Sequence, residues 1–226
     1  MIKFNYFVFV CCILFGACQL GPSVQRGYLD QKDEQVINDN FNNRLSQNNH
    51  SYVLPDSLKN DTILIALKSQ YRMHLYYSGR LIKSYVIALG QNPIGHKEEQ
   101  GDNKTPEGDY RIIQKTVGPF TGNYAAYLGS RWMRLNYPNN VDAKNGLQRG
   151  RISKAQYDAI VKANLNNKEP LKTTKLGGGI GIHGWNGPWP GTDRQDLTWG
   201  CISLQNQENE DLYNRIKVGC RVLILP

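Results

Sequence analysis

From about Thr62 to its last residue, the chain is a succession of short runs rich in β-branched and aromatic residues, separated by turn residues. Runs of this length and composition are typical of strands rather than of amphipathic helices. Ser78 and Gly79 separate two of the runs and predict a hairpin. A chain of many short strands with few helices predicts a β-rich α+β domain. The predicted strands lie in TILIALK, YRMHLYY, LIKSYVIAL, DYRII, RWMRLNYP, GIGIHG, GCISL and RVLILP.

Two segments carry helix signals. Ser153 and Gln156 have the spacing of a capping box at the start of SKAQYDAIVKANL. Asn206 is the expected N-cap of QENEDLYNRIK, which has acids in its first turn and Lys217 at its end. The first helix lies in a mostly polar stretch, residues 141–176, directly before the GIGIHG strand. This stretch is predicted to be an insertion that forms a flap over a groove.

The first residues have the order of a secretory signal peptide. Lys3 precedes an almost wholly apolar run, Phe4 to Phe15, and the small residues Gly16 and Ala17 follow. The run is shorter than the roughly 18 residues of a spanning helix, although a buried strand or a short anchor helix remains an alternative. The last residues of the segment, FGAC, resemble a lipobox, which would make Cys18 a lipidated N-terminus attached to a membrane. Residues 1–17 are therefore a predicted signal peptide.

Residues 18–58 are predicted to be a polar tether, and residues 59–226 a single domain. The tether contains NDNFNNRLSQNNHS and has too few aliphatic residues to form a core. The formal net charge of +8 is not concentrated in clusters of Lys and Arg interleaved with aromatic residues, which argues against a nucleic-acid partner. A basic surface on an exported protein favours an anionic cell-envelope polymer, although solubility alone explains it equally well.

The cysteines divide by position. Cys11 and Cys12 fall in the signal segment, and Cys18 carries the lipid if the lipobox is real, so Cys201 and Cys220 remain. A disulfide between these two is the ordinary expectation for an exported protein, but its formation depends on geometry. Cys220 precedes an alternating apolar run and is predicted to be a small core residue.

His183 and Cys201 each lie at the end of a strand-like run, with a Gly/Pro-rich loop between them. A nearby imidazole can take the proton of a thiol and create a nucleophile. The glycines before each residue allow close backbone approach, and residues 198–201 can aim successive amides at an oxyanion. The pair alone is weak evidence, because a core cysteine and a structural histidine explain it as well. Zinc is disfavoured because four ligands with recognisable spacing are missing.

The order of the motifs is more specific than the pair. His183-Gly184 followed by TWGCISL at residues 198–204 resembles the signature of the L,D-transpeptidase catalytic domain (YkuD-type), in a branch of the GCIAL type. That signature is a His-Gly followed by a Ser/Thr-x-Gly-Cys-Ile/Val-Arg-type run. The resemblance continues in the family's order from about Thr62 to the C-terminus, through SQYRMHLYYSGRLIKSYVIALG, GDNKTPEGDYRI, LNYPN, GGGIGIHG and NEDLYNRIKVGCRVLIL.

The resemblance implies a role for each matching position. Cys201 corresponds to the nucleophile and His183 to the general base. The supporting positions are the oxyanion-hole amides of Trp199, Gly200 and Cys201, the backbone of Gly184 that orients the imidazole, and the small hydroxyl residue Thr198.

Two positions depart from the family pattern. Ser203 stands where the family frequently has Arg, and Trp199 where it often has His. Both departures bear on the substrate contacts, which are assigned here to Trp185 and Ser203.

By the resemblance, the fold is the family's mixed β-sandwich, here with two short helices. The implied activity is acyl transfer on peptidoglycan stem tetrapeptides in cell-wall remodelling, through a thioester on Cys201 and without metal or cofactor. The acceptor is an amine, from a diaminopimelate side chain or an envelope-protein lysine. One alternative is the same site acting with water as a hydrolase, either a carboxypeptidase or an enzyme that releases a wall-attached protein. The other is a non-catalytic peptidoglycan-binding domain.

Overall fold

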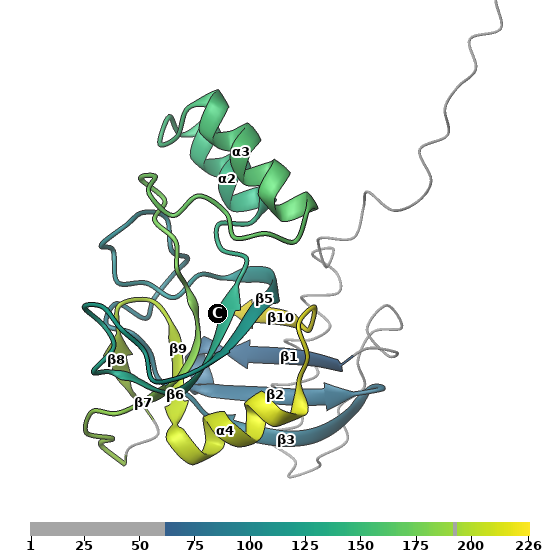
Figure 1. Cartoon of the computed structure of the whole chain (residues 1–226), viewed down its shortest axis with the longest axis vertical. Coiled ribbons are helices and arrows are strands. Elements are labelled where there is room, and N and C mark those ends of the chain that lie inside the picture. The colour runs from purple at the N-terminus through teal and green to yellow at the C-terminus, as the bar shows by residue number, and fades with distance from the viewer. Residues whose placement is uncertain (1–61, 192–193) are drawn as a thin grey trace, which may run out of the picture.

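The computed structural model describes residues 62–191 and 194–226 (Figure 1). The predicted signal peptide, the tether and Cys18 lie outside the described residues. In this described part of the chain, ten strands form an eight-stranded mixed sheet of order β3-β2-β1-β10-β5-β6-β7-β9 and a two-stranded sheet of β4 and β8. The bounds are β1 (Thr62–Leu67), β2 (Arg72–Tyr77), β3 (Arg80–Val86), β4 (Leu89–Gly90), β5 (Gly108–Val117), β6 (Leu128–Leu135), β7 (Gly181–Trp185), β8 (Asp196–Thr198), β9 (Ile202–Gln205) and β10 (Arg221–Leu225).

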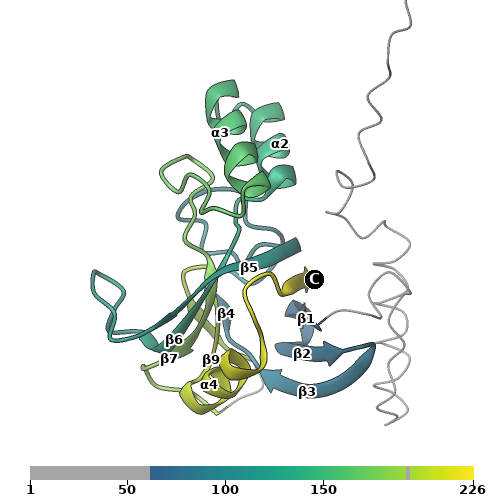
Figure 2. The same ribbon diagram turned by 45° about the vertical axis from the view of Figure 1, so that its right-hand side comes forward.

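The large sheet is strongly curled, and Figure 2 shows β1, β2 and β3 turned away from β5, β6 and β7. The predicted hairpin joins β2 and β3, with antiparallel pairing of Tyr77 and Arg80. Ser78 and Gly79 both have positive φ angles, 47° and 74°, as the tight turns that match the twist of a hairpin require. The β-rich α+β class and the predicted strands are confirmed.

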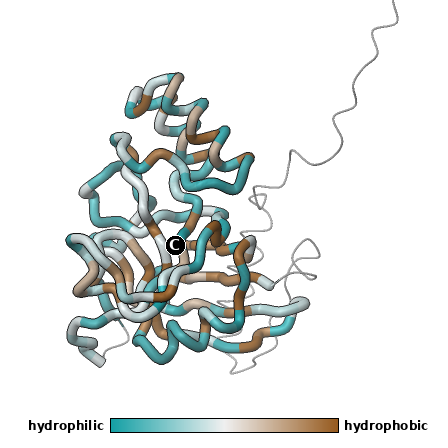
Figure 3. Tube along the Cα trace, in the orientation of Figure 1, coloured by the Kyte–Doolittle hydropathy of each residue, from teal (hydrophilic) through white to brown (hydrophobic). Residues whose placement is uncertain are grey.

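The middle of the sheet is buried on both faces. In β1, Leu64 and Ala66 belong to the main core, whereas Ile63, Ile65 and Leu67 belong to a second apolar cluster. This burial explains why TILIAL lacks the apolar–polar alternation of a strand with one wet face. Figure 3 shows the apolar stretches along the strands.

Both predicted helices are present, but the N-cap predicted for the second is wrong. Helix α3 (Lys154–Leu165) begins with the predicted capping box between Ser153 and Gln156. Helix α4 (Asn206–Arg215) starts at Asn206 itself, so Asn206 is not its cap. The N-cap residue is Gln205, which makes no side-chain capping bond.

A third helix, α2 (Asn140–Gln148), brings the α-helices of the described residues to three, where the sequence predicted two. Asn139 caps α2 in a reciprocal pair with Asp142. Helices α2 and α3 share a small core of their own, composed of Ala143, Ile152, Ile160 and Leu176.

Cys220 is buried in the main core directly before β10, as predicted. Within residues 62–191 and 194–226, no disulfide joins Cys220 to Cys201. The disulfide alternative is therefore absent from this structure.

The two faces of the β1–β3 region allow a matched test of burial. Ile65→Ala removes a fully buried side chain and should lower the free energy of unfolding by about 2–5 kcal/mol. Ile82→Ala makes the same change at a position that is 46% exposed and should cost roughly 0.5 kcal/mol or less. Urea unfolding of the two variants measures the difference, and equal losses would contradict the burial of β1.

Candidate active site

Parallel pairing of β7 with β9 brings the predicted site residues together. Ile182 pairs with Ile202 and His183 with Ser203, so Cys201 lies at the start of β9 beside Gly181. His183 and Cys201 both line an open cavity of about 440 Å³. Two residues 18 positions apart in the chain therefore line one cavity.

The His183 ring has a fixed tautomer. Its Nδ1 lies 2.6 Å from the backbone oxygen of Gly184. A carbonyl oxygen can only accept, so Nδ1 carries the proton and Nε2 keeps a lone pair. Burial lowers the pKa of His183 to about 4, although the bond to Gly184 opposes this shift. The imidazole is therefore neutral at neutral pH and able to accept a proton at Nε2.

Two tryptophans flank this imidazole. The Trp132 ring stacks on it at 5.7 Å and 23°, and the Trp185 ring lies 6.4 Å away at 38°. Trp132 also lines the cavity, and its buried Nε1 has no hydrogen-bond partner among the described residues. Sequence reasoning missed Trp132, because only the pairing of β6 with β7 brings it opposite His183.

The Cys201 thiol is half-buried and protonated at rest. Burial raises its pKa to about 11, because removal from water disfavours the thiolate. The backbone N–H of Gly181 and the charges of Lys97 and Arg134 oppose this shift. A neutral thiol and a neutral imidazole that line the same cavity fit proton transfer during attack rather than a preformed ion pair.

Thr198 organises the turn that carries the thiol. Its hydroxyl donates to the Cys201 carbonyl at 2.6 Å, and its oxygen accepts from the Gly200 N–H at 3.2 Å. Gly200 has a φ of 127°, and a Cβ there would lie 2.7 Å from the Lys104 carbonyl. Since the Gly200 N–H is engaged by Thr198, it is not offered to a ligand in this conformation. The oxyanion role of the Trp199 and Cys201 amides stays a prediction.

Ser203 and Trp185, the two predicted substrate contacts, do not line the cavity in this structure. Ser203 is fully buried, so its side chain is out of reach of a ligand in this structure. Trp185 is half-buried against His183, and its Nε1 donates to the Pro188 carbonyl at 3.1 Å. It is not among the residues that line the cavity.

Residues 60–224 match the YkuD family, described as the L,D-transpeptidase catalytic domain. The chain belongs to this family. No curated protein matches the chain.

Solved structures of similar proteins include three bacterial examples. The helical cell shape determining protein Pgp2 from Campylobacter jejuni is 25% identical, with a TM-score of 0.47 over 73% of this chain and 48% of that one. Bd1075 from Bdellovibrio bacteriovorus is 19% identical, with a TM-score of 0.47 over 77% and 51% of the two chains. An L,D-transpeptidase from Xylanimonas cellulosilytica is 15% identical, with a TM-score of 0.45 over 76% and 64%. The chain thus spans about half the length of the first two.

In this YkuD-family domain, a loop with an internal ion pair forms part of the cavity wall. Lys97, Gln100, Gly101 and Asn103 line the cavity, and the buried Lys97 Nζ lies 2.7 Å from Asp102 Oδ1. Asp102 also accepts from three backbone N–H groups of its own loop. Asp102 of the GDNKTPEGDY motif therefore stabilises the conformation of this loop.

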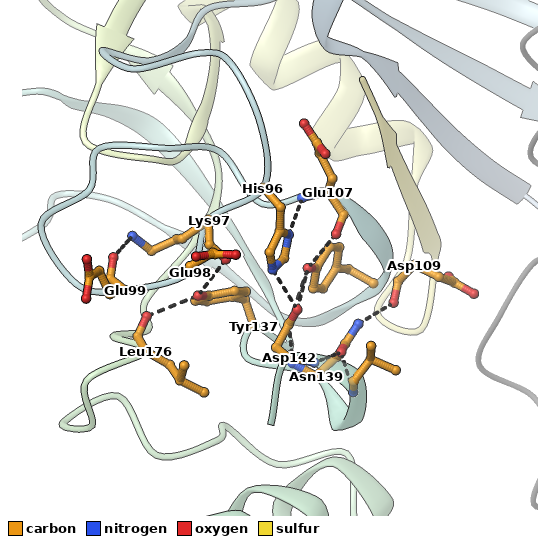
Figure 4. A network of polar contacts seen from close by, with 12 residues as sticks. His96, Lys97, Glu98, Glu99, Glu107, Asp109, Tyr137, Asn139, Asp142 and Leu176 are labelled. Atoms are coloured by element: carbon orange, nitrogen blue, oxygen red, sulfur yellow. Dashed lines mark hydrogen bonds and ion pairs between the residues drawn. The ribbon is translucent and has the colours of Figure 1, made fainter. Parts of the chain in front are cut away.

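A polar network joins this loop to α2 (Figure 4). His96 Nδ1 accepts from the Glu107 N–H at 3.0 Å, so Nε2 carries the proton and faces Asp142 Oδ1 at 3.3 Å. Tyr110 donates to the same carboxylate. Tyr137 donates to the Leu176 carbonyl at 3.0 Å, and this bond connects the segment before β7 to the same network.

Of residues 141–176, only Lys172 lines the cavity. Helices α2 and α3 stand beyond one end of the sheet in Figure 1 and do not form the predicted flap. The segment is instead anchored to the cavity loop through the polar network.

Asn206 packs against the backbone of Gly184, the residue that follows His183. Its Oδ1 occupies the space where a Cβ would stand on Gly184 or on Gly129, at 2.1 Å and 1.9 Å from those positions. Its Nδ2 donates to Asn186 Oδ1 at 2.8 Å, and Asn186 donates to the Leu128 carbonyl at 2.9 Å. This side chain therefore holds the backbone that binds His183 Nδ1.

Among residues 62–191 and 194–226, no helix has the length and apolar character to cross a membrane.

The contact between Gly184 and Asn206 predicts a non-additive pair. Gly184→Ala places a methyl group against Asn206 Oδ1 and should lower the free energy of unfolding by about 1–3 kcal/mol. Adding Asn206→Ala removes the clashing oxygen, so the double variant should lose less than the sum of the single losses. Urea unfolding of the four chains gives the coupling energy. Additive losses would mean that the two residues do not touch.

The protonation states predict the pH dependence of thiol reactivity. With a thiol pKa of about 11, iodoacetamide should alkylate Cys201 about tenfold faster for each unit of pH between roughly pH 7 and 10. Peptide mass spectrometry assigns the modified cysteine, and Cys201→Ala gives the background from Cys220. A rate that levels off near neutral pH would indicate a preformed thiolate–imidazolium pair and contradict the neutral resting state.

Proposed function

We propose that the chain is a peptidoglycan L,D-transpeptidase with Cys201 as its nucleophile. Membership of the L,D-transpeptidase family supports the reaction class. The observation that carries the residue assignment is the cavity that Cys201 shares with a neutral His183 whose protonated Nδ1 is fixed by Gly184. This arrangement suits a base that accepts the thiol proton at Nε2.

In the first half-reaction, Cys201 Sγ attacks the carbonyl carbon of the L-centre of diaminopimelate in a stem tetrapeptide, while the thiol proton passes to His183 Nε2. The backbone amides of Trp199 and Cys201 are the proposed donors to the oxyanion. When the intermediate collapses, the C–N bond breaks and His183 returns the proton to the amine of the departing D-residue. Because burial makes its imidazolium a strong acid, His183 is suited to this second step.

In the second half-reaction, an acceptor attacks the thioester and releases the Cys201 thiol. An amine, from a diaminopimelate side chain or an envelope-protein lysine, gives a new amide bond and completes the transpeptidation. Water at the same step gives a carboxypeptidase. The half-buried thiol lies in an open cavity, which leaves room for an acceptor.

We also propose that the protein is exported and acts on the cell envelope. The apolar run after Lys3, the lipobox-like FGAC and the polar composition of residues 19–58 support export, with a lipid on Cys18 and a tether to the domain. The family's action on the cell wall supports the same location.

The nucleophile assignment predicts a covalent adduct. Incubation with a stem tetrapeptide, or with a carbapenem, should add the acyl mass to Cys201, and Cys201→Ala should abolish this addition. His183→Ala should slow it by about 100-fold, the scale expected for removal of a positioned base. Cys220→Ala, a change at the other cysteine, should leave it intact.

Intact-mass and peptide mass spectrometry measure these rates, and an added amine acceptor separates transpeptidation from hydrolysis by the product formed. An adduct that persists in Cys201→Ala would overturn the assignment of the nucleophile.

A further inference from the structure

Three aromatic side chains on the cavity wall form a continuous exposed cluster, called here the aromatic platform: Tyr124, Tyr127 and Trp199. Each of them lines the cavity that contains Cys201. The Trp199 ring lies 5.2 Å from that of Tyr124 and 5.1 Å from that of Tyr127. Trp185 stacks on Tyr127 at 5.4 Å and 24°. The rings therefore pack on one another as one cluster.

The platform is unusually exposed for side chains of this size. Tyr124, Tyr127 and Trp199 keep 58%, 41% and 38% of their surface accessible. A contiguous patch of exposed aromatic rings is typical of a binding surface, because it leaves apolar area in water. The backbone below it is also fixed, since Tyr127 O accepts from the Asn186 N–H at 3.1 Å. An exposed cluster of packed aromatic rings is suited to a ligand with an apolar face.

We propose that the aromatic platform binds a sugar ring of the glycan to which the stem peptide is attached. One face of a pyranose presents C–H groups, which pack on an aromatic face while the hydroxyl groups around the ring keep their hydrogen bonds to water. This inference rests on the proposed function, because the stem peptide links the sugar to the carbonyl that Cys201 attacks.

The distance between thiol and platform suits this ligand. The attacked carbonyl belongs to the third residue of a tetrapeptide whose first residue is joined to the sugar, so about three residues, or roughly 10 Å of extended chain, separate the two. Trp199 is two positions from Cys201, at most roughly 7 Å along the backbone. The centroid of the Tyr124 ring lies 5.2 Å from that of the Trp199 ring. The platform therefore lies within reach of a sugar on an acylating stem peptide.

The size of the platform also favours a sugar over a protein partner. Three aromatic side chains at these exposures offer roughly 300 Å² of accessible surface, on the basis of about 150–250 Å² for each whole side chain. A stable protein interface needs about 800 Å² from each partner. A sugar is therefore the occupant whose size the platform matches.

The test compares two ligands, the free stem tetrapeptide and the same tetrapeptide carrying its disaccharide. Each is titrated against the full chain bearing Cys201→Ala, so that no turnover occurs, and the dissociation constants are measured by calorimetry. The disaccharide-bearing ligand should bind about five- to tenfold more tightly, as one added aromatic contact of roughly 1–1.4 kcal/mol gives.

Three further substitutions identify the platform. Tyr124→Ala should bring the affinity ratio of the two ligands close to one, whereas Tyr124→Phe should preserve it, because the ring rather than the hydroxyl makes the contact. Tyr77→Ala is the matched control, since Tyr77 is similarly exposed, at 61%, and lies on β2 away from the cavity. It should leave the ratio unchanged.

Equal affinities for the two ligands, a preference that survives Tyr124→Ala, or no binding of either ligand at millimolar concentration would overturn the proposal. Adduct formation by unsubstituted Cys201 with the free tetrapeptide tests the proposed function separately. An adduct together with equal affinities would leave the function standing and remove the platform. A preference for the disaccharide-bearing ligand that depends on Tyr124, without an adduct, would leave the platform standing and remove the proposed function.

Discussion

The parallel pairing of β7 with β9 determines where the thiol and the imidazole lie, and the rest of the site depends on it. Parallel neighbours need a long connection, and here that connection also passes through β8, which pairs with β4. Gln91 donates to the Thr198 carbonyl at 2.8 Å, and Ala88 exchanges two backbone bonds with Ser203. The turn that carries Cys201 is therefore fixed on both sides by backbone bonds. Its position depends on the sheet and on very few side chains.

Burial has opposite effects on the two reactive groups and leaves both neutral. It lowers the pKa of His183 and raises that of Cys201, so neither group carries charge at rest. Thiolates, rather than thiols, undergo oxidation and disulfide exchange. A protonated thiol in a half-buried position is therefore less open to oxidation and to disulfide exchange with Cys220 than a thiolate would be.

Local sequence signals predicted the elements whose causes are local, such as the hairpin at Ser78 and Gly79 and the capping box at Ser153. They failed where contacts with residues far away in the sequence determine the local structure. Helix α2 escaped prediction because it is polar and contains Gly146, a glycine that makes room for the Leu176 side chain. Asn206 has the residue type of a cap, but its side chain contacts Asn186 and two glycines of neighbouring strands. The proposed catalytic pair was found from the order of the motifs, since spacing along the chain cannot show that Cys201 and His183 share a cavity.

Helices α2 and α3 have their own small core, separate from that of the sheet. The contacts that join this pair to the cavity loop are mainly polar, through His96 and Asp142, and the connection between the helices is the short segment 149–153. Such an architecture is modular, because its helical part can lengthen, shrink or be exchanged during evolution without repacking the β-sheet. For protein engineering, the exposed residues 166–168 after α3 are accordingly a suitable point at which to insert a fluorescent or affinity domain, because the turn 149–153 carries the core residue Ile152 and the cap Ser153.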